Sequence, residues 1–319
     1  MKIPTALSRR RFLSAAASVP FLAGSGEGKE PLPGPGALMR LGGPVQQKYS
    51  SPEEWVALVQ GLGYNAVYCP VADARDESLL RAYVEAARKA NLVIAETGAW
   101  SNPMAPDPEE RKKALEKCKA QLDLAERVGA RCCVNISGNR GNPWAGNHPL
   151  NLTGETFNMI VEITRSILDA VRPTRTYYAL ETMPWSYPDT VDSYLRLIKA
   201  IDRKRFAAHM DPVNLVSSPQ LYFRTADLLR DGFKKLGPYI KSCHAKDIIL
   251  SQKQNVHLDE ILPGQGNLDY RVYLQELRKL NDVPLMIEHL RTPEEYRQAA
   301  DHIRKTAGEV GWAAPTGRS

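Results

Sequence analysis

Four apolar stretches in the second half of the sequence each end in an acidic or imidazole side chain. They read ALETMPW, AAHMDPVNL, KSCHAKD and LMIEHL, and the groups at their ends are Glu181, Asp211, His244 and Glu288. Taken singly, each could be a helix cap or a solvated loop residue. If the fold brings the ends of these stretches together, the three carboxylates would repel one another unless a cation neutralised them. One imidazole and three carboxylates suit one divalent metal ion, and these ligand types do not select among Mn²⁺, Mg²⁺, Co²⁺ and Zn²⁺.

Other side chains at or beside strand ends are candidates for substrate contact. They are Glu96, Trp100, Asn135, Trp185, His209, Asn214, Lys246 and Asp247. The long loop GNRGNPWAGNHP adds Trp144 and His148. Each candidate has a plain alternative, because loop aromatics are often exposed, a core histidine can simply be hydrogen-bonded, and a loop lysine can be solvated.

These residues belong to a repeated alternation of short apolar runs and longer amphipathic segments. The predicted strands are Leu38–Leu41, Ala66–Cys69, Leu92–Glu96, Cys132–Ile136, Tyr177–Glu181, Phe206–Asp211, Ile240–His244 and Pro284–Glu288. The predicted helices are Pro52–Gly61, Glu77–Ala90, Pro108–Val128, Gly154–Val171, Val191–Ile201, Thr225–Leu236, Tyr270–Lys279 and Pro293–Ala307. Eight strands, each followed by a helix, predict an α/β fold of the (β/α)₈ TIM-barrel type, in which chemistry takes place at the carboxyl ends of the strands.

The main alternative fold is a doubly wound open sheet. No G-x-G-x-x-G motif follows the first predicted strand, so a dinucleotide site is not indicated. No break in composition divides residues 37–312, which we therefore interpret as one domain. The five cysteines are odd in number and lack zinc-site spacing, which favours buried small hydrophobic residues.

Five motifs in barrel order resemble the xylose isomerase-like TIM-barrel superfamily, in its sugar phosphate isomerase and epimerase branch. They are ALETMPW, HMDPVNL, SCHAKD, PGQGNLDY and MIEHL, and the resemblance covers residues 37–312. In that branch, groups at four successive strand ends bind one divalent metal, and these match Glu181, Asp211, His244 and Glu288. The resemblance also implies that Glu181 and Glu288 are the catalytic acid and base on opposite faces of a bound sugar. A metal chelated by the carbonyl and hydroxyl oxygens of a ketose would stabilise the enediolate formed on proton loss.

The sequence departs from the best-known ketose epimerases at three positions. Asn214 replaces a histidine, Tyr187 a second glutamate, and Leu250 an arginine. The run HAKD at 244–247 is more similar to the inosose dehydratases, where related metal sites eliminate water. Because the four metal-ligand positions are kept, we expect a metal-dependent sugar isomerase or epimerase. The alternative is a lyase or dehydratase acting on a keto-sugar, keto-inositol or 3-keto-glycoside, and a non-catalytic sugar-binding barrel is a weaker hypothesis.

The charge distribution bears on the partners and location of the protein. The formal net charge of the 319 residues is +6, of which residues 1–24 carry +4, leaving +2 for residues 25–319. This near-neutral body offers no basic face for a phosphate backbone, which disfavours nucleic acid as a partner and a DNA-repair endonuclease as the function. The expected partner is a small-molecule carbohydrate, and members of the superfamily often pair, which is compatible with a homo-oligomer.

The N-terminal segment has the layout of an export signal. Arg9, Arg10 and Arg11 precede Phe12-Leu13 and a short, Ala-rich apolar stretch. This arrangement predicts a twin-arginine signal peptide and tether over residues 1–30, and a periplasmic or other extracytoplasmic location. The apolar stretch is too short to span a bilayer, so no stable membrane insertion is expected after cleavage. The twin-arginine route exports folded proteins, often with a metal already loaded.

Overall fold

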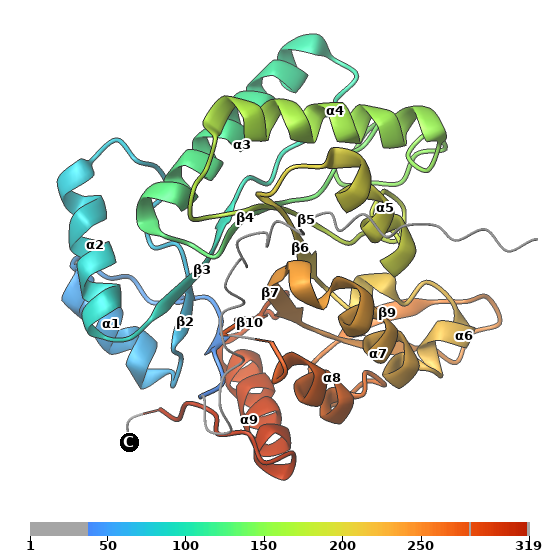
Figure 1. Cartoon of the computed structure of the whole chain (residues 1–319). Coiled ribbons are helices and arrows are strands. Elements are labelled where there is room, and N and C mark those ends of the chain that lie inside the picture. The colour runs from blue at the N-terminus through green and yellow to red at the C-terminus, as the bar shows by residue number, and fades with distance from the viewer. Residues whose placement is uncertain (1–37, 281, 318–319) are drawn as a thin grey trace, which may run out of the picture. The chain divides into compact units, whose positions relative to one another are not determined.

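Eight parallel strands form a closed barrel in the computed structural model, which describes residues 38–280 and 282–317. Going round the barrel, the order is β1, β10, β7, β6, β5, β4, β3, β2 (Figure 1). The barrel strands are β1 (Leu41–Gly42), β2 (Ala66–Tyr68), β3 (Val93–Gly98), β4 (Cys132–Asn135), β5 (Tyr178–Glu181), β6 (Phe206–Met210), β7 (Ile240–Ala245) and β10 (Leu285–Ile287). Each predicted strand has a counterpart in the barrel, although β1 shares only Leu41 with the predicted Leu38–Leu41. Closure of the sheet confirms the barrel and excludes the open-sheet alternative.

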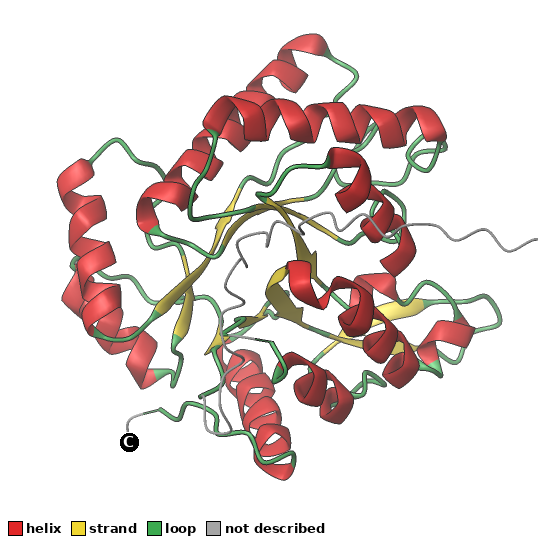
Figure 2. Ribbon diagram, viewed as in Figure 1, coloured by secondary structure: helices red, strands yellow, loops and turns green. Residues whose placement is uncertain are grey.

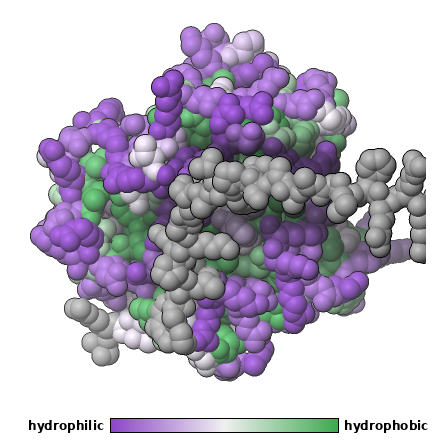
Figure 3. Space-filling model, in the orientation of Figure 1, coloured by the Kyte–Doolittle hydropathy of each residue, from purple (hydrophilic) through white to green (hydrophobic). Residues whose placement is uncertain are grey.

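Helices surround the barrel on the outside (Figure 2). They are α1 (Pro52–Gly61), α2 (Glu77–Lys89), α3 (Pro108–Val128), α4 (Gly154–Val171), α5 (Val191–Ile201), α6 (Pro219–Tyr222), α7 (Thr225–Leu236), α8 (Tyr270–Leu277) and α9 (Pro293–Glu309). The predicted helix starts are confirmed, and preceding side chains such as Ser51, Asp107 and Thr190 cap their helices. In the face shown by Figure 3, hydrophilic side chains gather over the outer helices.

A two-stranded hairpin after β7 was not predicted. Its strands β8 (Asp247–Leu250) and β9 (Leu258–Ile261) are antiparallel, with Asp247 opposite Ile261 and Leu250 opposite Leu258. Each strand is only four residues long, and its apolar pattern is too short to separate it from a loop. The hairpin matters for the site because β9 carries an acidic side chain, Glu260, to the carboxyl end of the barrel.

The described part of the chain packs around one main hydrophobic core. Apolar residues of the barrel strands and helices form this core, and Cys118, Cys133 and Cys243 are buried in it as free thiols. Among residues 38–280 and 282–317, no helix is long and apolar enough to cross a bilayer. The predicted twin-arginine leader lies outside the described residues and stays a prediction.

Candidate metal and substrate site

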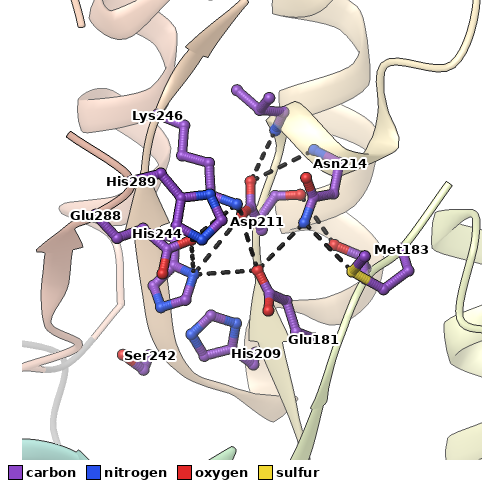
Figure 4. Close-up of polar contacts among 12 residues, drawn as sticks. Glu181, Met183, His209, Asp211, Asn214, Ser242, His244, Lys246, Glu288 and His289 are labelled. Atoms are coloured by element: carbon purple, nitrogen blue, oxygen red, sulfur yellow. Dashed lines mark hydrogen bonds and ion pairs between the residues drawn. The ribbon is translucent and has the colours of Figure 1, made fainter. Parts of the chain in front are cut away.

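The four predicted metal ligands converge at the carboxyl end of the barrel. Glu181 ends β5, His244 lies near the end of β7, and Asp211 and Glu288 directly follow β6 and β10. His244 Nδ1 lies 2.8 Å from Glu288 Oε1, 3.2 Å from Glu181 Oε1 and 3.7 Å from Asp211 Oδ2. One ligand atom from each residue lies within 4.8 Å of all the others, and Figure 4 shows the side chains pointing toward a common centre. We call these four residues the carboxylate–histidine cluster.

The electrostatics of the cluster call for a cation. Asp211 Oδ2 and Glu288 Oε1 accept no well-directed hydrogen bond, although the Lys246 ammonium lies 2.8 Å from each as an ion-pair partner. Burial raises the pKa of Glu181. Burial also acts to raise the pKa of Glu288, but the charges of His244 and Lys246 outweigh it and lower the pKa to about 2. Three carboxylates and one imidazole, with two buried carboxylate oxygens that accept no well-directed hydrogen bond, fit a divalent metal ion.

A second layer of polar side chains lies beneath the cluster, inside the barrel. Glu96 on β3 is 2% exposed and accepts hydrogen bonds from the Ser242 hydroxyl and from His209 Nε2 at 3.1 Å. Its other oxygen lies 3.4 Å from His244 Nε2. His209 and Asp211 lie two residues apart along the chain, as do Ser242 and His244, so each pair shares a face of the barrel at two depths (Figure 4).

This lower layer can orient the face of His244 that meets the carboxylate–histidine cluster. When Nε2 donates its proton to Glu96, the lone pair of Nδ1 points at the cluster, which is the tautomer a metal requires. Glu96, His209 and His244 are also close enough together to hold an ion. Because Glu96 is already hydrogen-bonded within the barrel, we interpret this trio as support for the cluster. Glu96 and His209, predicted as substrate contacts, thus lie beneath the carboxylate–histidine cluster and do not line the cavity described below.

Two further predicted substrate contacts, Asn135 and Asp247, form hydrogen bonds to the backbone of loops. Asn135 is fully buried. Its side chain accepts a hydrogen bond from the Ser101 N–H at 3.1 Å and donates one to the Ser101 carbonyl at 3.2 Å. Asp247 accepts four backbone N–H groups at 2.9–3.0 Å. The donors are Ile248, Gly264, Gly266 and Leu268. The motif PGQGNLDY is therefore a loop wrapped around Asp247, so both residues hold loops in place and neither lines the cavity.

The two glycines of this loop are required by its geometry. Gly264 has φ +94°, a conformation that favours glycine, and a Cβ on Gly266 would lie 2.3 Å from Asp247 Oδ1. The loop approaches the buried carboxylate closely enough to donate two backbone N–H groups only because both positions lack a side chain.

Replacement of Asp247 by asparagine is expected to lower the free energy of unfolding by about 2 kcal/mol or more. The amide nitrogen would face two backbone N–H donors in place of an oxygen that accepts them, inside a site that is 1% exposed. Denaturant unfolding followed by circular dichroism measures the change. Asp259→Asn, on the exposed side of β9, makes the same chemical change and should leave stability within experimental error. Equal midpoints for the two variants would contradict this role.

A cavity of about 660 Å³ opens above the cluster. It brings together Glu181 and Glu288 with four of the predicted substrate contacts, Trp100, Trp185, Asn214 and Lys246. Asn214 lies in the 3₁₀ turn η1 (Val213–Leu215) and donates to Glu181 Oε1 at 3.2 Å, so it holds the position of that carboxylate.

An acid–imidazole pair on the cavity wall was not predicted from the sequence. Glu260 Oε2 lies 2.9 Å from His289 Nδ1, and Glu260 Oε1 lies 3.4 Å from Lys246 Nζ. His289 has φ +60° and stays half exposed beside Glu288. Nothing in the sequence relates Glu260 to His289, because the β8–β9 hairpin that joins them was not expected.

The three residues that depart from the ketose epimerases lie in different surroundings. Asn214 faces the cavity and donates to Glu181. Tyr187 is directed to the β4–α4 loop, where its hydroxyl donates to the Leu152 carbonyl at 3.0 Å. Leu250 ends β8. Only Asn214 among these residues lines the cavity.

The chain belongs to the xylose isomerase-like TIM barrel family, whose model matches residues 56–306. Among curated proteins, no sequence matches it. Solved structures with the same fold include a probable 3-DHS dehydratase from Bacillus anthracis, with a TM-score of 0.63 at 17% identity, covering 84% of this chain and 99% of that one. A 3-keto-D-glucoside 4-epimerase from E. coli has a TM-score of 0.61 at 15% identity, covering 84% and 99%. A xylose isomerase-like protein from Mycobacterium smegmatis, in complex with magnesium, has a TM-score of 0.58 at 17% identity, covering 82% and 90%.

Proposed function

We propose that the protein is a divalent-metal-dependent isomerase or epimerase of a ketose or related sugar. The observation that carries the proposal is the carboxylate–histidine cluster at the base of the cavity, with Asp211 Oδ2 and Glu288 Oε1 lacking directed hydrogen bonds. The family membership supports it, as does the occurrence of the same fold in a 3-keto-D-glucoside epimerase and in a protein that binds magnesium.

The side chains around the cluster suit proton transfer next to a carbonyl. A divalent ion, when bound, polarises substrate oxygens and so acidifies the adjoining C–H group. Glu181 and Glu288 approach the centre from β5 and β10, so one carboxylate can remove a proton and the other can return it. Asn214 holds Glu181 through its amide, and the Lys246 ammonium can donate to a substrate oxygen at the same centre.

A lyase that eliminates water or an alcohol from a keto-sugar is the second candidate. Elimination needs a proton donor for the departing oxygen as well as a base for the carbon acid. The Glu260–His289 pair lies on the cavity wall beside Glu288 and supplies an imidazole in that position. The probable dehydratase of the same fold is consistent with this alternative.

Metal titration and solvent-exchange measurements test the proposal together. Isothermal titration of the metal-stripped protein with Mn²⁺ should give one site per chain. Incubation with a panel of ketoses in D₂O should place deuterium next to the carbonyl, and EDTA should abolish the exchange until Mn²⁺ is restored. An unsaturated product in place of simple exchange would favour the lyase. Absence of a metal site, or exchange that EDTA leaves unchanged, would overturn metal-dependent catalysis.

A further inference from the structure

The cavity above the cluster has two halves of different chemistry. One half carries charged and polar groups, namely Glu181, Asn214, Lys246, Glu260, Glu288 and His289. The other half carries mainly aromatic and apolar side chains, namely Tyr68, Trp100, Ile136, Trp144, Met183 and Trp185. The aromatic half comes from β2 and from the segments that follow β3, β4 and β5, whereas most of the charged half comes from β9 and from the segments that follow β6, β7 and β10. We call it the tryptophan half.

The cavity is larger than a single sugar ring requires. Its volume of about 660 Å³ lies within the range of about 300–1,000 Å³ that holds drug-sized ligands. A sugar whose oxygens reach the carboxylate–histidine cluster occupies the charged half. The tryptophan half remains to be filled, and its walls offer aromatic surface and few hydrogen-bonding groups.

Two of the three tryptophans are partly exposed. Trp100 is 37% exposed and Trp144 is 41% exposed, although both line the same cavity. Large exposed apolar side chains that cluster in a concave site gain free energy when a ligand covers them. The uncovered surface therefore points to an apolar ligand group.

The loops that carry the indoles are braced against one another. Trp185 Nε1 donates to the Ala145 carbonyl at 3.1 Å, next to Trp144. The Ser137 and Ser186 hydroxyls lie 2.6 Å apart, and Ser186 also donates to the Gly138 carbonyl. The only polar atom of the Trp185 indole is thus satisfied, and its ring is left for apolar contact.

Trp100 is held in place by contacts with β3 and with the loop that follows it. Its indole packs across the backbone of Gly98, where a Cβ would lie 2.3 Å from Trp100 Nε1. The following loop is held by Asn102, whose side chain donates to the Asn139 carbonyl and accepts from the Asn139 and Met104 N–H groups. A site whose aromatic groups are positioned in advance loses less entropy when its ligand binds.

We infer that the tryptophan half is a subsite for a flat, apolar group attached to the sugar, so that the substrate is a glycoside of a keto-sugar, with a ketone on the sugar ring and an aromatic aglycone. This inference rests on the proposed function for the sugar-binding end of the cavity. The indoles of Trp100, Trp144 and Trp185 would stack on the aglycone while the sugar oxygens face the carboxylate–histidine cluster.

Calorimetric titration with paired probes tests the inference on the Mn²⁺-loaded protein. The probes are the 4-nitrophenyl and methyl D-glucopyranosides, each as the α and the β anomer. We expect the aryl glycoside of the preferred anomer to bind about tenfold more tightly than the methyl glycoside, because aromatic stacking adds to the burial of apolar area. Trp144→Ala and Trp100→Ala should each remove most of this gain, so that the affinity for the aryl glycoside falls by a larger factor than the affinity for the methyl glycoside.

Two further variants separate ring contact from disturbed folding. Trp144→Phe keeps a ring and should keep part of the gain. Phe223→Ala removes a 70% exposed aromatic side chain that does not line this cavity, and should leave both affinities unchanged. Equal binding of aryl and methyl glycosides, no binding of either, or equal losses for both probes in the tryptophan variants would overturn the aglycone subsite.

The outcome also separates this inference from the proposed function. If aryl preference is absent but free ketoses exchange deuterium in a metal-dependent way, only the aglycone subsite fails. If aryl preference depends on the tryptophans but no metal-dependent exchange or elimination is found, the subsite stands and the proposed function fails.

Discussion

Glu288→Gln is expected to lower turnover by about 10²–10⁴-fold, the range typical for loss of a general acid or base. Glu288 Oε1 lies 2.8 Å from both His244 Nδ1 and Lys246 Nζ, at the centre of the cluster. Glutamine keeps the size of the side chain but can neither accept a proton at neutral pH nor neutralise a bound cation. The measurement is the initial rate of deuterium incorporation into the best ketose or glycoside substrate at saturating Mn²⁺, with metal affinity measured in parallel by calorimetry.

The matched control is Glu162→Gln, which makes the same chemical change at an exposed position of α4 and should leave rate and metal affinity unchanged. Glu181→Gln should resemble Glu288→Gln, and the double variant should lose much less than the product of the two single effects, because the two residues act as a unit. Full turnover of Glu288→Gln at saturating metal would show that Glu288 only ligates. Unchanged turnover together with unchanged metal affinity would remove Glu288 from the site.

The parts of the fold that the sequence predicts are those set by local patterns. Apolar runs mark the barrel strands, and capping side chains such as Asp107 and Thr190 mark helix starts, so these elements could be placed from the residues alone. The four members of the cluster could be chosen because parallel strands in a barrel end at the same rim. Their convergence follows from closure of the sheet.

The depth and direction of a side chain are what the sequence pattern leaves open. His209 and Asp211 share one face of the barrel interior, yet Asp211 reaches the cluster and His209 ends beneath it on Glu96. Asp247 follows a strand as Asp211 does, but the loop that ends in Leu268 folds back and surrounds its carboxylate. Glu260 reaches the cavity through a hairpin whose short strands give no distinct periodicity. Such outcomes depend on tertiary contacts between segments far apart in the chain.

The buried carboxylate of Glu96 should control metal affinity without touching the metal. Glu96→Gln is expected to weaken Mn²⁺ binding by about 10–100-fold, the usual effect of losing the outer partner of a metal-ligating histidine. The carboxylate accepts from His209, Ser242 and His244, and burial, which acts to raise its pKa, is outweighed by the charges of the two histidines. A glutamine amide would direct an N–H group at one of these donors and release the preferred orientation of His244.

Calorimetric titration with Mn²⁺ measures this effect on protein shown by circular dichroism to be fully folded. Ser242→Ala is the graded control, since it removes one hydrogen bond from Glu96 and keeps the negative charge, so its loss of affinity should be smaller than that of Glu96→Gln. If Glu96→Gln binds Mn²⁺ as the unsubstituted protein does, the hydrogen bond from His244 Nε2 does not select the ligating tautomer. If Glu96→Gln lost catalysis while metal affinity stayed unchanged, Glu96 would act on the substrate. We do not expect this result, because the carboxylate–histidine cluster lies between Glu96 and the cavity.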